Sequence, residues 1–295
     1  MATPELLAGL FEEHRPHVRA IAYRMLGSLG DADDAVQDTW IRMSRADTSG
    51  VDNLRAWLTT VVSRVCLDML RARAARREES LDTHVPDPIV TRARRDEGPE
   101  AEALRADSLG LALLVVFDTL DPDERLAFVL HDVFGLTFAE IAPIVDRSVP
   151  ATRQLASRAR RRVRGQAPSP DPDLRAQRRV VEAFLAAVSD GDVDALVAVL
   201  APDIVLRADG GAAKGLSRVV RGAQDVVSQA AMFSKLALSN QIVLVNGHIG
   251  VVSRLPDGRP FSVIGFTVSG GRVVEIDILA DADRIARLDL PTATD

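Results

Sequence analysis

The chain has 295 residues, enough for two or three domains, and its composition of 47% hydrophobic and 26% charged residues is that of a globular protein. No apolar run reaches the roughly 18 residues of a membrane span, and the first residues lack a signal-peptide pattern. The single cysteine, Cys66, excludes an internal disulfide framework, and its apolar neighbours favour a core thiol. We therefore expect a cytoplasmic protein with no membrane partner. Its net charge of −6 argues weakly against nucleic-acid binding, unless basic residues gather locally.

The first 77 residues predict three helices. Apolar residues at helical spacing indicate helices over Glu5–Met25, over Asp31–Ser44 with Asp31 as its cap, and over Leu54–Arg77. Residues 1–47 carry eight acids and five arginines, a net charge of −3, whereas the third helix carries six arginines and one aspartate, a net charge of +5. This contrast suggests two different partners.

A linker is predicted next, because residues 78–106 combine prolines and charge runs with little periodicity. Helical pattern resumes over Leu109–Leu120. Asp121 and Pro122 then form a strong start for a helix that runs to Val133.

Two short helices and a tight turn are predicted over Thr137–Arg164. Thr137 and Glu140 have capping-box spacing, and Ser148 can cap the second helix. Pro143 should kink or shorten the first helix, and Asp146 occupies the turn. From Thr137 to Gly165 there are seven arginines and two acids, a net charge of +5, and a basic helix after a helix and turn is the form that enters a DNA major groove.

After a second break at residues 166–172 the pattern changes to α+β. Helices are expected over Leu174–Val188, Val193–Leu200 and Gly222–Leu236, and strands over Ile204–Arg207, Gln241–Val245, Ile249–Leu255, Phe261–Val268 and Val273–Leu279. Hairpin signals join the last four strands, which predicts an antiparallel meander.

With these elements in place, the chain resembles a bacterial RNA polymerase sigma factor of the extracytoplasmic-function (ECF) group. DADDAVQDTWIRM and LRAWLTTVVSRVCLDMLRAR resemble sigma region 2, and LDPDERLAFVLHDVFGLTFAEIA with the basic helix after it resembles region 4. The last domain resembles the SnoaL-like, ketosteroid-isomerase-like cone that a subset of these factors carries. The expected fold is multidomain: all-α region 2 at 1–77, a linker at 78–106, an all-α helix-turn-helix region 4 at 107–165, a linker at 166–172, and an α+β SnoaL-like domain at 173–295.

The resemblance implies that the chain binds core RNA polymerase, at the β′ clamp helices and the β flap, and directs initiation at specific promoters. The exposed stripe of Asp34, Gln37 and Asp38 would dock on the clamp helices, with a merely solvated acidic face as the alternative. The basic helix would capture the melted −10 strand. Candidate contacts there are Arg55, Trp57, Arg64, Arg71 and Arg73, although Trp57 also suits a position in the core.

The basic helix of region 4 is the candidate reader of the −35 element. Its early residues should reach base edges and its later arginines the phosphates, while a solvated basic helix end is the alternative. The candidates are Arg153, Gln154, Ser157 and Arg158 for bases, and Arg160, Arg161, Arg162 and Arg164 for phosphates.

Three sequence landmarks of this subset bear on regulation, which we expect the SnoaL-like domain to exert in cis. A Trp-Leu-Pro-Glu-Pro linker motif appears as His84–Pro88, an Asn-Pro-Asp-Lys motif as Asp281–Arg284, and an Asp-Gly-Gly motif is kept. The residues singled out for regulation are Pro86, Asp87, Pro88, Asp209, Gly210, Gly211, Asp283 and Arg284.

Evidence for catalysis is thin, because the sequence has no P-loop, HExxH, CxxC or nucleophile elbow. Acid/base candidates in the cone are Asp203, Asp209, His248 and Asp277. We expect no enzyme, cofactor or metal. The alternative is a SnoaL-like enzyme that converts a small molecule, or a ligand-sensing regulator with a DNA-binding helix-turn-helix, and a small apolar ligand in the last domain stays open.

Overall fold

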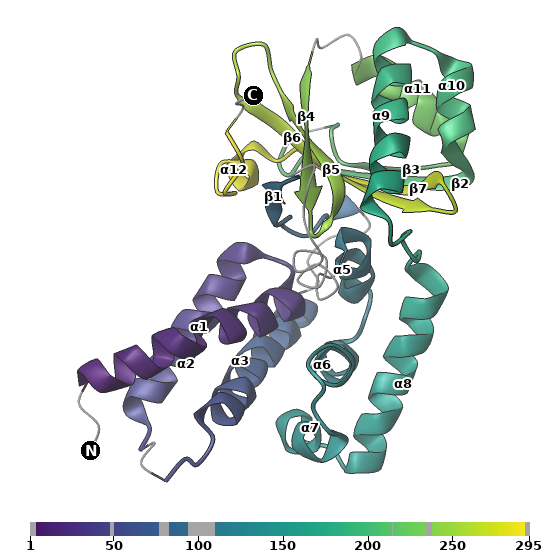
Figure 1. Ribbon diagram of the computed structural model, residues 1–295. Coiled ribbons are helices and arrows are strands. Elements are labelled where there is room, and N and C mark those ends of the chain that lie inside the picture. Colours follow the sequence, from purple (N-terminus) through teal and green to yellow (C-terminus); the bar gives the residue numbers. More distant parts are fainter. Residues whose placement is uncertain are drawn as a thin grey trace. The chain divides into compact units, whose positions relative to one another are not determined.

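The computed structural model describes residues 4–47, 50–76, 83–93, 110–213, 215–233 and 238–292 (Figure 1). It divides into two compact units. The first combines Met1–Glu79 with Val116–Gln166, and the second combines Ser80–Val115 with Ala167–Asp295. The chain therefore leaves the first unit at the predicted linker and returns to it within region 4. Much of that linker, 78–82 and 94–106, lies outside the described residues.

The first unit is helical throughout its described part. Its elements are α1 (Pro4–Leu26), α2 (Leu29–Arg45), α3 (Leu54–Arg76), α6 (Pro122–Phe128), a π-helical turn (Val129–Val133), α7 (Phe138–Val145) and α8 (Val149–Gln166). α5 (Leu111–Asp118) crosses the boundary between the units. A helix forms in each segment of this unit where the sequence predicts one, although the bounds of two differ. Cys66 is fully buried, and desolvation raises the pKa of its thiol to about 12.

Two helix predictions need correction. Ser28, not Asp31, caps α2: its hydroxyl accepts the Asp31 N–H at 3.3 Å, so the helix begins at Leu29. The helix that opens after Asp121 ends at Phe128 and continues as a π-helical turn, instead of running as one α-helix to Val133.

The helix-turn-helix forms as its sequence predicts. Thr137 and Glu140 make both bonds of the capping box, and Asp146 takes the left-handed conformation at φ 54° where the turn needs it. Pro143 lies within α7, which is only eight residues long. Ser148 accepts the Ala151 N–H at 3.4 Å and so caps α8.

The second unit contains a seven-stranded sheet in the order β1-β4-β5-β6-β7-β2-β3. The strands are β1 (Val90–Arg92), β2 (Leu200–Asp209), β3 (Arg218–Arg221), β4 (Ser239–Val245), β5 (His248–Arg254), β6 (Pro260–Ser269) and β7 (Arg272–Leu279). The helices are α9 (Leu174–Asp190), α10 (Val193–Val199), α11 (Ala223–Phe233) and α12 (Ala282–Ile285). The predicted antiparallel meander is confirmed over β4 to β7, while β2 pairs with β7 in parallel. β1, β3 and α12 were not predicted.

Both faces of this sheet carry a hydrophobic core. One core joins residues of α9, α10 and α11 to the sheet, including Phe184, Leu206 and Phe266. The other contains Leu279 of the sheet together with Val85 and Val90, which come from the predicted linker. Part of that linker is therefore built into the second unit.

Candidate nucleic-acid interface and linker contacts

The recognition helix α8 has one buried and one exposed face. Thr152, Leu155, Ala156 and Ala159 face the core of region 4. The predicted base-reading residues Arg153, Gln154, Ser157 and Arg158 are all exposed, because they occupy the opposite side of the helix. The helical spacing of these residues in the sequence is therefore enough to identify the exposed face of α8, which is the face that could enter a DNA groove.

Three of the predicted DNA arginines are already paired within region 4. Glu124, only 2% exposed, accepts Arg158 Nε at 2.6 Å and lies 3.1 Å from Arg162, and Arg160 bonds to Asp132 at 2.7 Å. To bind DNA, each of these arginines would have to leave its carboxylate partner and bind a phosphate instead. Arg161 and Arg164 are exposed and have no carboxylate partner within the described residues.

The predicted −10 residues of region 2 lie on α3, and two of them contact region 4. Arg71 bonds to Asp123 of α6 at 2.7 Å, and Arg64 donates to the Pro143 carbonyl oxygen of α7 at 3.0 Å. We call these two bonds the region 2–region 4 contact. They occupy both arginines in this conformation.

The other predicted −10 residues lie within region 2. Arg73 pairs with Asp31, and Arg55 donates to His17 Nδ1 at 3.2 Å. Trp57 is half-buried, which fits neither a core residue nor a free stacking platform cleanly.

His17 of region 2 also contacts region 4, with its ring edge-on to Phe134 at 5.8 Å between ring centroids. Its Nδ1 accepts from Arg55, so Nε2 carries the hydrogen that Thr59 Oγ1 accepts at 2.9 Å. Burial and then the charge of Arg55 lower the pKa of His17 to about 4. The ring is therefore neutral at pH 7.

The acidic stripe predicted for polymerase binding faces outward. Asp34, Gln37 and Asp38 are exposed on α2, while Ala35 and Val36 between them are buried. The three side chains are thus available to a partner.

One arginine of α12 in the SnoaL-like domain binds the linker. Arg284 bonds to Asp87 at 2.7 Å, to Asp209 at 2.7 Å, and to the Val85 carbonyl oxygen at 2.6 Å. Asp209 in turn accepts the Val85 N–H at 3.1 Å. We call this group the linker clasp.

The electrostatics of the linker clasp favour an ionised Asp209. Burial alone would raise its pKa, but hydrogen bonds from His84, Val85 and Gly211, together with the charge of Arg284, outweigh burial and lower the pKa well below its usual range. The clasp is therefore charged at neutral pH.

The linker also contributes a short strand, β1, to the sheet of the SnoaL-like domain. β1 pairs antiparallel with β4, and Asn246 both accepts the Ile89 N–H and donates its own N–H to the Ile89 carbonyl oxygen, each at 2.9 Å. Pro86 and Pro88 are buried beside it. β1 has no periodic signal in the sequence, because three residues are too few and their pairing partner lies far along the chain.

The glycines and Asp283 complete the list of predicted regulatory residues. A Cβ on Gly210 would lie 2.3 Å from Leu216 Cβ, and one on Gly211 would lie 1.9 Å from Asp281 Oδ2, so both glycines allow close packing at the clasp. Asp283 is exposed, and the structure gives its carboxylate no contact with the described linker residues. Asp281, which was not singled out, caps α12 and so orients Arg284.

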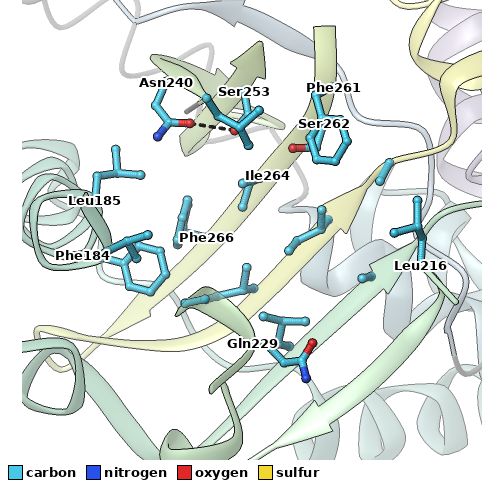
Figure 2. A pocket seen from close by; sticks show the side chains of 18 of the residues that line it. Phe184, Leu185, Leu216, Gln229, Asn240, Ser253, Phe261, Ser262, Ile264 and Phe266 are labelled. Carbon is cyan, nitrogen blue, oxygen red and sulfur yellow. Dashed lines mark hydrogen bonds between the residues drawn. The ribbon is translucent and has the colours of Figure 1, made fainter. Parts of the chain in front are cut away.

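A cavity opens on the helix-covered face of the sheet, but the predicted acid/base residues are not among its described lining (Figure 2). Asp203 is exposed, and Asp209 belongs to the linker clasp. Asp277 is buried with Glu275 and Arg207, and its pKa is raised by burial. His248, whose pKa burial lowers, accepts from Gln177 at 3.4 Å.

Among the described residues, no group of three or more His, Cys, Asp and Glu side chains is arranged to hold a metal ion. No helix in the described part of the chain has the length and apolarity to cross a membrane.

Family models match the chain in three places. Sigma-70 region 2 matches residues 10–76, Sigma-70 region 4 matches 110–163, and the SnoaL-like domain matches 181–286. The ECF RNA polymerase sigma factor SigJ of Mycobacterium tuberculosis is 41% identical over 288 residues, 93% of this chain and 91% of that protein. This chain belongs to the ECF sigma factors.

A further relative and a solved structure agree with that assignment. A probable ECF sigma factor, SigI of Mycobacterium tuberculosis, is 38% identical over 232 residues, covering 77% of this chain and 76% of that protein. The crystal structure of SigJ aligns with a TM-score of 0.74 at 35% identity, covering 96% of this chain and all of that one. The expected fold class, two helical sigma regions followed by a SnoaL-like α+β domain, is thereby confirmed for this sigma factor.

Arginines of α8 that have no carboxylate partner among the described residues should contribute more to DNA binding than to stability. Arg161→Ala and Arg164→Ala should each weaken binding to a −35 duplex and reduce the salt dependence of log K by about one phosphate contact, without lowering the melting temperature. Fluorescence anisotropy at several salt concentrations measures both. Arg158→Ala is the comparison: it removes the charged hydrogen bond to buried Glu124, which then keeps only Arg162 at 3.1 Å, and should lower the free energy of unfolding by about 1–3 kcal/mol. Unchanged DNA binding in both Arg161 and Arg164 variants would contradict the assignment.

The second prediction concerns His17 and pH. Folding lowers its pKa from 6.5 to about 4, so the unfolded chain binds more protons between these values. The stability that neutral His17 contributes is complete above about pH 6.5 and is lost as pH falls toward 4. His17→Gln should therefore lose less melting temperature between pH 7 and pH 5 than the unaltered chain, whereas His14→Gln should not differ from it. The same pH dependence in all three proteins would rule out this role.

Proposed function

We propose that this sigma factor binds core RNA polymerase through regions 2 and 4, and that its SnoaL-like domain controls how freely the two regions separate. The boundaries proposed are residues 1–77 for region 2, 107–165 for region 4 and 173–295 for the controlling domain. Polymerase contact is assigned to Asp34, Gln37 and Asp38, and promoter contact to α3 and α8. Such a factor acts in the cytoplasm, where its polymerase works.

The observation that carries this proposal is the bonding of Arg64 and Arg71 to region 4. The −10 and −35 elements lie about 25 base pairs apart, roughly 85 Å at 3.4 Å per base pair. Two segments that share hydrogen bonds cannot occupy both elements at once. The described conformation is therefore a closed state, from which regions 2 and 4 must part before they can read a promoter.

The linker clasp supports the role of the SnoaL-like domain in that transition. The chain connects regions 2 and 4 through the linker 78–106, and residues 85–92 of this linker are bonded to the SnoaL-like domain. Fixing these residues shortens the chain that is free to span the two promoter elements. Release of the linker would lengthen it again.

We also propose that the SnoaL-like domain regulates without catalysis, since its four acid/base candidates are held elsewhere than the cavity. A ligand-sensing role is the second candidate, and the cavity itself favours it.

Run-off transcription with purified core polymerase tests the proposal. The unaltered chain should direct initiation at its promoter, and Arg284→Met, which breaks the clasp, should raise the transcript level severalfold because the linker is freed. Arg287→Met is the matched control: this exposed arginine makes, among the described residues, a local side-chain bond to the Asp283 carbonyl oxygen and none to the linker. No promoter-specific transcript from any variant would overturn the sigma assignment of function, and equal transcript from all three would overturn control through the clasp.

A further inference from the structure

The cavity of the second unit is lined largely by apolar side chains. It has a volume of about 230 Å³, enough for a molecule on the order of ten non-hydrogen atoms when a water molecule takes about 30 Å³. Phe184 of α9 and Ile264 and Phe266 of β6 point into it (Figure 2). Leu206 and Ile276 from β2 and β7 complete the apolar wall.

One lining residue, Arg218, carries a positive charge. Arg218 of β3 lies directly across from Ala208 of β2 in the antiparallel register, so both side chains project from the same face of the sheet. Ala208 and Arg218 both line the cavity, as does Gln229 of α11. Among the described lining residues, Arg218 is the one ionisable group.

The partners of Arg218 are neutral. Its guanidinium donates to Gln229 Oε1 at 2.5 Å and to the Gly215 carbonyl oxygen. Arg207, on the neighbouring strand but the opposite face, is instead paired with two carboxylates, Glu275 and Asp277. The sheet thus neutralises the arginine on one face and leaves the arginine at the cavity without a carboxylate in the described chain.

We infer that the cavity binds an apolar monocarboxylate, with its carboxylate on Arg218 and its hydrocarbon part among the phenylalanine and aliphatic side chains. A planar guanidinium binds a carboxylate through two parallel hydrogen bonds, and an apolar environment strengthens them. An amine would be repelled by Arg218, and an alcohol would lack the charge. Ser262, which is 3% exposed and lines the cavity, can satisfy a further polar atom of the ligand.

The loop between β2 and β3 connects this site to the linker. It begins at Asp209 in the linker clasp and ends at Arg218, and Leu216 within it lines the cavity while packing on Gly210. A ligand that moves Arg218 or Leu216 therefore acts on the segment that holds the linker. This consequence rests on the proposed function, whereas binding itself does not.

Isothermal titration calorimetry on the purified full chain, without polymerase, tests the inference with octanoate, 1-octanol and octylamine. Octanoate should bind with one site per chain and at least about tenfold more tightly than 1-octanol, and octylamine most weakly, because a hydrogen bond to a charged group contributes about ten- to a hundredfold. Arg218→Gln should reduce octanoate affinity to that of 1-octanol. Arg221→Gln is the control, since Arg221 is exposed on the same strand and does not line the cavity.

Equal or stronger binding of 1-octanol or octylamine by the unaltered chain would overturn the inference, as would no binding of octanoate. An equal effect of Arg218→Gln and Arg221→Gln would place any binding elsewhere and overturn it too. Because polymerase is absent, failure here leaves control by the linker clasp standing. Conversely, transcription unaffected by Arg284→Met would leave the binding site intact.

Discussion

The Arg284 guanidinium is the point on which the organisation of the second unit depends. It bonds to a carboxylate from the linker, to a carboxylate from the end of β2, and to a linker carbonyl oxygen. These groups are 75 to 199 residues from Arg284 along the chain. A partly buried cation with two carboxylates costs desolvation, but removal of one partner leaves the others uncompensated. The clasp is thus formed or broken as a whole, which suits a switch.

The linker clasp matters because of where the linker lies in the chain. Residues 83–93 lie in the sequence between sigma regions 2 and 4, yet by packing they belong to the unit that contains the SnoaL-like domain. Regions 2 and 4 are bonded to each other by Arg64 and Arg71, which are also the residues expected to contact the melted strand. Under the proposed function, contacts that keep the factor closed compete directly with promoter DNA.

Local sequence signals predicted local structure well. The capping box of Thr137 and Glu140 and the left-handed Asp146 depend on neighbours within a few residues, so spacing is enough to identify them. Asp31 was mistaken for a cap because its real role, the ion pair with Arg73, is set by a residue far along the chain.

The candidate site could be predicted only in part, because some of its contacts join residues that lie far apart in the sequence. Exposure of Arg153 and Gln154 follows from helical periodicity. The pairing of Arg158 with buried Glu124 does not, since it joins two helices. β1 is stable only because the edge of β4 supplies its partners, and the position of Arg218 at the cavity depends on its register with β2. Contacts of this kind are invisible to periodicity, whatever its strength.

The most direct test of the account is amide hydrogen exchange in the linker. The Val85 and Ile89 N–H groups donate to Asp209 and Asn246, which both belong to the SnoaL-like domain by sequence. Slow exchange of both amides in the intact chain, and fast exchange in a chain truncated after residue 166, is the predicted result. Fast exchange in the intact chain, or equal exchange in both chains, would contradict the claim that the SnoaL-like domain holds the linker.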